Sequence, residues 1–150
     1  MKTTEEMKIA LRNRIAELHE IAPGSIGDQM CYELLGADKR GVYNMRCKTF
    51  DWMRNGPGTL HGGMCATIVD QAMGFVAYCA KPGNGIAPTV QLQVEYHRAL
   101  IPGENVLVDV QLVSATRSLM HLSANVYQES APDKLCLSAT SVFFYKPEEK

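Results

Sequence analysis

The chain has 150 residues, of which 46% are hydrophobic and 21% are charged, and its formal net charge is −1. This length is enough for one domain with a hydrophobic core and too short for two ordinary ones, so we expect a single domain over residues 1–150. The basic residues are scattered, which argues against a nucleic acid partner, because phosphate binding requires a concentrated positive patch.

The first predicted element is a helix within residues 1–20, from about Thr3 to Glu20. Apolar residues recur in it at steps of three and four, a spacing typical of one buried helix face. These residues are Met7, Leu11, Ile15 and Leu18. Thr3 or Thr4 can cap the helix, because a hydroxyl accepts a hydrogen bond from an unpaired N–H of the first turn.

A hairpin is predicted next. Residues 22–28, "APGSIGD", interrupt the helical pattern, and two strand-like runs then flank the segment "GADKRG". Glycine and polar residues between two such runs are typical of a hairpin turn.

A long apolar helix is predicted over about residues 60–80, between the loop "NGPG" and the breaker "KPGNG". Its apolar residues cover most of the circumference, so the helix requires a sheet packed around it. Thr67, Asp70 and Gln71 lie on one polar side. Asp70 is unusual there, because a carboxylate in apolar surroundings costs free energy unless it is paired or used in chemistry.

The last third predicts four strands. "TVQLQVEYH" alternates, with Val90, Leu92, Val94 and Tyr96 on one face. Three similar runs begin near Val106, Leu119 and Leu135. Four strands with short turns favour an antiparallel meander, and the whole order of elements predicts an α+β fold with an antiparallel sheet and a buried central helix.

The cysteines and the first residues of the chain indicate in which cellular compartment the protein is expected. Five cysteines, without a C-x-x-C pair, favour a reducing environment over a disulfide scaffold or a zinc site. The first residues lack a signal-peptide core, and no run of 18 apolar residues occurs. We therefore expect a cytoplasmic location, no membrane association and no bound metal.

The central segment resembles a known enzyme family. An asparagine is followed six residues later by H-G-G, an aspartate comes seven residues after the second glycine, and "VEYHRALIPG" follows. The residues concerned are Asn55, His61, Gly62, Gly63 and Asp70. Over roughly residues 32–146 this pattern resembles the phenylacetic-acid-degradation (PaaI-like) branch of hotdog acyl-CoA thioesterases. The hotdog fold wraps an antiparallel sheet around a central helix. "YHRAL" departs from the family's more usual Y-x-R-P-A by lacking the proline.

The resemblance implies a set of residue roles. Asp70 would be the catalytic carboxylate, the Gly62 N–H would bind the thioester oxygen, and Asn55 and His61 would complete the catalytic site. Four further residues are expected to contact substrate: Gly63, Thr67, Gln71 and Thr89. Thr89 corresponds to a small hydroxyl residue on the following strand in some members. No cofactor is implied, because coenzyme A is part of the acyl-CoA substrate.

The residue types agree with this chemistry. The first turn of a helix has N–H groups without intrahelical partners and carries partial positive charge, and glycine lets a carbonyl approach closely. Gly62 can therefore provide an oxyanion hole, although the two glycines could also serve only close packing of the entering loop. Asp70 can act either as general base on water or as a nucleophile that forms a mixed anhydride.

Helix geometry predicts how the site is assembled. Gly62 and Asp70 are eight residues apart, or about 12 Å along a helix, so one chain's Asp70 cannot reach a carbonyl at its own Gly62. We therefore predict a homodimer in which Gly62 of one subunit and Asp70 of the other form each site. The resemblance to hotdog relatives further implies a homotetramer.

Two other functions remain open from the sequence. A non-catalytic hotdog protein could hold an acyl-CoA or another ligand in the same groove. A dehydratase or hydratase would need a paired acid and base, and no histidine follows Asp70 until His97. The acyl group is also undecided between aromatic groups and short or medium chains.

Overall fold

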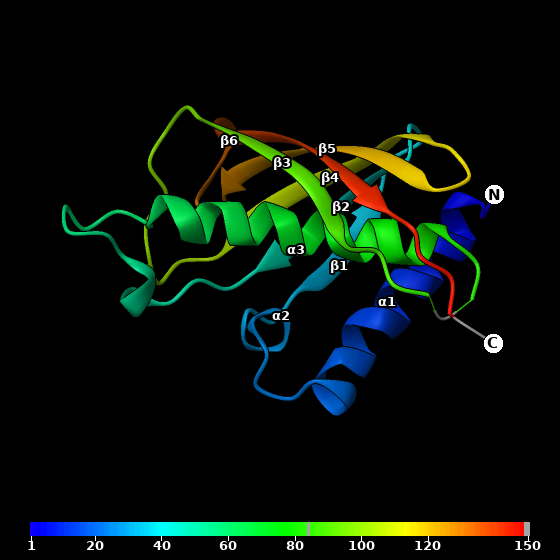
Figure 1. The fold of residues 1–150 in the computed structure, drawn as a ribbon. Helices are drawn as coiled ribbons and strands as arrows, with labels where there is room; N and C mark the ends of the chain where they lie inside the picture. The colour runs from blue at the N-terminus through cyan, green and yellow to red at the C-terminus, as the bar shows by residue number, and fades with distance from the viewer. Residues whose placement is uncertain (84, 149–150) are drawn as a thin grey trace.

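The computed structural model describes residues 1–83 and 85–148. A six-stranded antiparallel sheet runs in the order β1-β2-β4-β5-β6-β3, and helix α3 lies across one of its faces (Figure 1). The strands are β1 (Glu33–Ala37), β2 (Val42–Cys47), β3 (Thr89–Tyr96), β4 (Val106–Ala115), β5 (Leu119–Gln128) and β6 (Ala131–Phe144). The predicted α+β fold with a central helix is confirmed.

Helix α3 (Gly62–Ala80) forms the centre of the core. Ile68, Val69, Ala72, Met73 and Val76 are fully buried within one hydrophobic cluster that includes the inward residues of the strands. The helix is long and apolar enough to cross a membrane, with a mean hydropathy of 1.2. Its apolar composition is accounted for by packing against the sheet, which removes those side chains from water.

The N-terminal helix α1 (Thr4–Ile21) matches its predicted range. Thr3 caps it, and Glu6 returns a hydrogen bond to the Thr3 N–H, so both ends of a capping box are present. Met7 and Leu11 are buried in the shared core. Two short helices, α2 (Ile26–Gln29) and the 3-10 helix η1 (Asp51–Met53), lie on either side of the β1–β2 hairpin.

The predicted four-strand meander is wrong in one connection. Of the four predicted strands, β4, β5 and β6 pair in chain order, whereas β3 pairs with β6, and β4 pairs with β2. The link over residues 97–105 is too long for a tight hairpin and passes the start of α3, where the Leu60 N–H donates to the Leu100 carbonyl at 2.9 Å. The chain therefore crosses the helix before it enters β4.

Strand β3 is left at the edge of the sheet. Its alternating apolar face is only partly covered within one chain: Leu92 and Val94 are half-buried, while Val90 and Tyr96 are 62% and 55% exposed. An edge strand also presents unpaired backbone N–H and C=O groups. Both the edge and the apolar face of β3 are therefore available for further contacts.

Candidate active site

Asp70 lies on α3 beside the start of β3, the edge strand of the sheet. Its neighbours Ile68 and Val69 are fully buried, but Asp70 itself is half-buried. The hydroxyl of Thr89 donates a hydrogen bond to Asp70 Oδ1 at 2.7 Å. This is the only hydrogen bond to that carboxylate within the described residues, so Oδ2 is left available for a water molecule or a substrate.

The start of α3 offers a free backbone donor. The Gly62 N–H has no hydrogen-bond acceptor among the described residues, as expected for the first helical residue. The Gly62 carbonyl accepts a hydrogen bond from the Tyr96 hydroxyl at 2.7 Å. A Cβ at Gly62 would lie 3.6 Å from Tyr96, an ordinary contact. Packing within the chain therefore does not require glycine here.

His61 caps the same helix. Its Nδ1 accepts a hydrogen bond from the Gly63 N–H at 2.9 Å. This nitrogen is therefore an acceptor and cannot donate a hydrogen bond to a substrate. The contact occupies the Gly63 amide and leaves the Gly62 amide as the free donor of the pair. His61 is thus in place to orient the helix start, and its Nε2 is on an exposed ring.

Asn55 closes the loop before the helix. Its Oδ1 accepts the Thr59 N–H at 2.9 Å, and its Nδ2 donates to the Thr59 hydroxyl at 2.9 Å. One Nδ2 hydrogen is left over, because the amide carries two. Asn55 also lines a cavity of about 330 Å³ together with Gly62, Tyr96 and Arg98. This cavity is the space beside the free Gly62 amide.

Within one chain the predicted residues therefore form two groups. Asn55, His61 and Gly62 lie together at the start of α3. Asp70 lies on the same helix, eight residues after Gly62, and is hydrogen-bonded to Thr89 of β3. The remaining predicted contacts lie along the same side of α3. Thr67 donates from its hydroxyl to the Gly63 carbonyl at 3.0 Å, and the Gln71 side chain lines a separate cavity further along α3.

The cysteines provide no activated nucleophile near this site. All five are free thiols. Burial raises the pKa of Cys65 to about 11, so its thiol stays protonated at neutral pH. The expectation that Cys65 is a buried core residue is confirmed. Within residues 1–83 and 85–148, no cluster of three or more His, Cys, Asp or Glu side chains could hold a metal ion.

Tyr96 is a site residue that the sequence analysis missed. It was assigned only to the apolar face of its strand. The signal was its place in "VEYHRAL", one residue before the strand leaves the sheet, where a hydroxyl on an otherwise apolar face needs a partner. In the structure that partner is the Gly62 carbonyl.

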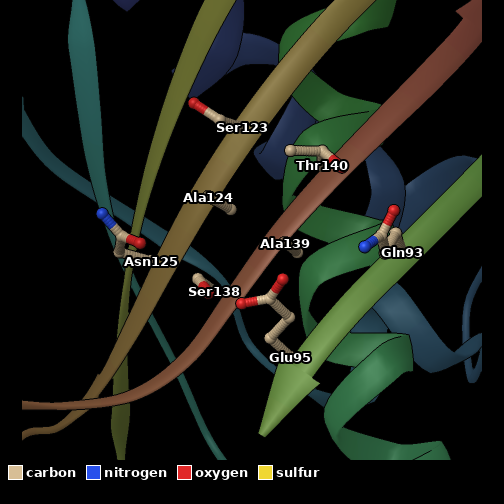
Figure 2. Close-up of a pocket in the computed structure, with 8 residues that line it drawn as sticks. All are labelled: Gln93, Glu95, Ser123, Ala124, Asn125, Ser138, Ala139 and Thr140. Carbon is tan, nitrogen blue, oxygen red and sulfur yellow. The ribbon is translucent and has the colours of Figure 1, made fainter. Parts of the chain in front are cut away.

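A further hollow, of about 230 Å³, lies on the outer face of the sheet. Figure 2 shows its polar residues on β3, β5 and β6, with α3 behind the strands. They include Gln93, Glu95, Ser123, Asn125, Ser138 and Thr140. None of these side chains contacts Gly62 or Asp70, because the sheet separates them from the helix.

The fold is that of a hotdog protein, and among the described residues the amide at the start of α3 and one oxygen of the Asp70 carboxylate have no hydrogen-bond partner. Residues 57–133 match the family model of the thioesterase superfamily. Since this match covers half of the chain, the chain belongs to the thioesterase superfamily, and its activity class is thioester hydrolysis. Both agree with the sequence-based predictions. The narrower phenylacetic-acid-degradation branch stays a prediction.

Solved structures support the same fold. Thioesterase superfamily member 2 from Mus musculus is similar over 96% of this chain and 98% of its own, with a TM-score of 0.71 and 20% identity. A mutant thioesterase from Pseudomonas aeruginosa has a TM-score of 0.76 at 13% identity, covering 91% and 94%. A Streptococcus mutans protein bound to acetyl-CoA has a TM-score of 0.65 at 22% identity, covering 79% and 91%.

Proposed function

We propose that the protein hydrolyses an acyl-CoA thioester at sites shared between two copies of the chain. In each site Gly62 of one subunit binds the thioester oxygen, and Asp70 of the other subunit acts on the carbonyl carbon. Family membership supports thioester hydrolysis, and the acetyl-CoA bound to the similar Streptococcus mutans protein supports coenzyme A as the carrier.

One observation carries the shared site. The Gly62 carbonyl is held by Tyr96, at the end of β3, and Asp70 is held by Thr89, at its start. If two β3 edges pair in antiparallel fashion around a two-fold axis, the end of one strand meets the start of the other. Gly62 of one subunit then comes close to Asp70 of the other. The uncovered edge and the exposed Val90 and Tyr96 side chains support this pairing.

The chemistry follows from this arrangement. The free Gly62 N–H and the partial positive charge of the helix start stabilise the negative charge that develops on the thioester oxygen. With Asp70 as general base, its Oδ2 takes a proton from water as the water oxygen bonds to the carbonyl carbon. The C–S bond then breaks, and the proton passes to the departing sulfur, giving a carboxylic acid and free coenzyme A.

Asp70 can instead attack the carbonyl carbon itself and form a mixed anhydride that water cleaves. A single turnover in ¹⁸O-water detects the second route when water cleaves the anhydride at the Asp70 carbonyl. Direct attack by water puts the label in the released acid alone. A mixed anhydride cleaved at the Asp70 carbonyl leaves label in the Asp70 side chain, which mass spectrometry of the peptide detects.

The proposal extends to the carrier, the compartment and the assembly. The cavity beside Gly62 is the space proposed for the arm of coenzyme A, with Arg98 at its margin. Neither metal nor cofactor takes part in the mechanism. The five free thiols support a location in the cytoplasm, and assembly of two dimers into a homotetramer follows from the resemblance to hotdog relatives.

The test is release of free coenzyme A from a panel of acyl-CoA thioesters, measured by chromatography because Cys31 is exposed and would react with a thiol reagent. Asp70→Asn should lower kcat by about 10²–10⁴-fold. Asp133→Asn, which changes an exposed carboxylate on β6, is the matched control and should leave kcat unchanged. Full activity of Asp70→Asn, or no turnover of any thioester by the wild type, would overturn the proposal.

A further inference from the structure

A second cavity continues along α3 beyond Asp70. It measures about 240 Å³ and includes Gln71 and Gly74 from α3 and Ala87 from the segment before β3. Gln71 directly follows Asp70, and Ala87 comes two residues before Thr89. The residues that line the cavity therefore include close sequence neighbours of both Asp70 and Thr89, on the two segments that hold this pair.

The cavity has the size of a site for part of an acyl group. Gly74 and Tyr78 lie about 6 and about 12 Å beyond Asp70 along the helix. Leu18 and Phe75 provide apolar walls. For scale, an engineered cavity of about 150 Å³ in another protein holds benzene. A short acyl chain passing Asp70 would thus have its far end in this cavity.

Arg14 of α1 stands at the far end. Its guanidinium lies 4.0 Å above the Tyr78 ring, and its side chain is 24% exposed. Within the described residues it donates no hydrogen bond, and its nearest carboxylate, Glu17, is 4.0 Å away and 58% exposed. A guanidinium carries five N–H donors in a planar fork. These donors are therefore free to bind a ligand in the cavity.

The charge around Arg14 favours an anion. Arg14, Tyr78 and Glu17 also line a neighbouring cavity of about 230 Å³, which includes Lys2 and Lys81. Three cations thus face one carboxylate. Lys2 donates to the Cys79 carbonyl, and Lys81 donates to the Thr116 carbonyl at 2.6 Å, so both ammonium groups are fixed near the end of α3. A concentration of positive charge of this kind attracts anionic groups.

We propose that this cavity binds the far end of the acyl group and that the preferred substrates are ω-carboxyacyl-CoA thioesters, the half-thioesters of dicarboxylic acids. The Arg14 fork matches a carboxylate in bidentate geometry, while Leu18 and Phe75 contact the methylene chain. This inference rests on the proposed acyl-CoA thioesterase function and specifies the substrate class of the same site.

The experiment compares thioesters of equal chain length with and without the terminal carboxylate: adipoyl-CoA against hexanoyl-CoA, and suberoyl-CoA against octanoyl-CoA. The wild type should prefer the carboxylated member by about tenfold or more in kcat/KM, the value of a charge-assisted hydrogen bond. Arg14→Gln should abolish that preference by lowering kcat/KM for the carboxylated thioesters, and Arg14→Lys should retain part of it. Arg12→Gln, on an exposed position of the same helix, should change nothing.

Three results would overturn the inference: a wild type that prefers hexanoyl-CoA or phenylacetyl-CoA, an Arg14→Gln variant that keeps the preference, or one that loses turnover of all thioesters equally. Circular dichroism checks that the variant is folded. If the variant is unfolded, the preference of the wild type between the carboxylated and uncarboxylated thioesters tests the inference. Calorimetry with non-hydrolysable thioether analogues of the two acyl groups gives a readout without turnover. Tighter binding of the adipoyl analogue together with no hydrolysis would contradict the proposed function and support the specificity.

Discussion

Replacing Gly62 by proline removes one atom of interest, the amide hydrogen proposed to bind the thioester oxygen. Proline is well tolerated at the first helical position, where the N–H has no intrahelical partner. His61, which would precede it, has φ −58° and ψ 136°, an extended conformation that a residue before proline favours. The substitution should therefore leave α3 intact.

The expected effect is on catalysis alone. Loss of one oxyanion donor costs about 2.7–4 kcal/mol, or 10²–10³-fold in kcat. Gly62→Ala keeps the N–H, and its Cβ would meet Tyr96 at 3.6 Å without a clash, so its kcat should stay within about tenfold of wild type, or 1.4 kcal/mol. The assay is chromatographic release of coenzyme A, with thermal unfolding as a check on stability. A Gly62→Pro variant that is folded and turns over like the wild type would refute the oxyanion role.

Further predictions concern the neighbouring contacts and the core. Thr89→Val removes the hydroxyl that donates to Asp70 at 2.7 Å and should lower kcat by about 10–100-fold, the value of a hydrogen bond to a charged group, with rescue by Thr89→Ser; an unchanged kcat for Val would contradict a positioning role. Tyr96→Phe removes the hydrogen bond to the Gly62 carbonyl and should lower kcat about 2–10-fold with KM unchanged; a rise in KM alone would assign Tyr96 to binding. Leu11→Ala, at a fully buried position, should lower the free energy of unfolding by about 2–5 kcal/mol in urea titrations, whereas Ile9→Ala at a 58% exposed position should change it by less than about 0.5 kcal/mol. Alkylation of the native protein followed by mass spectrometry should modify the exposed Cys31 and spare the buried Cys65, whose raised pKa keeps the thiol protonated; rapid labelling of Cys65 with loss of activity would contradict its core assignment.

The elements defined by local pattern could be predicted from the sequence. Helix α1 follows from the spacing of Met7 and Leu11 and from Thr3 as cap, and α3 follows from an apolar run between two glycine-containing loops. The inward faces of β4 and β5 follow from the alternation of apolar and polar residues, and Val108 and Leu122 on these faces are buried. These features depend on neighbours within a few residues, which the sequence presents directly.

The pairing of β3 could not be predicted in the same way. Whether β3 lies beside β4 or beside β6 depends on the path of residues 97–105 past the start of α3, a contact between segments far apart in sequence. The exposure of Val90, on the apolar face of the predicted strand, has the same origin, because an edge strand has a neighbour on one side only.

Within the site, spacing alone identified the separation between Gly62 and Asp70, because helix rise is fixed at about 1.5 Å per residue. Spacing could not identify the side chains that form hydrogen bonds with Gly62 and Asp70. Thr89 was named through a family resemblance as a substrate contact, and the structure places its hydroxyl on Asp70. Tyr96 and Arg14 were missed, since their contacts join segments that only the tertiary fold brings together.

The most direct test of the shared site is to mix two inactive variants, Gly62→Pro and Asp70→Asn, after confirming by native mass spectrometry that subunits exchange. Random pairing makes half of the dimers mixed, and each mixed dimer contains one site with an intact Gly62 and an intact Asp70. The mixture should therefore recover about a quarter of wild-type activity. A mixture with confirmed mixed dimers that stays as inactive as its parents would contradict the account.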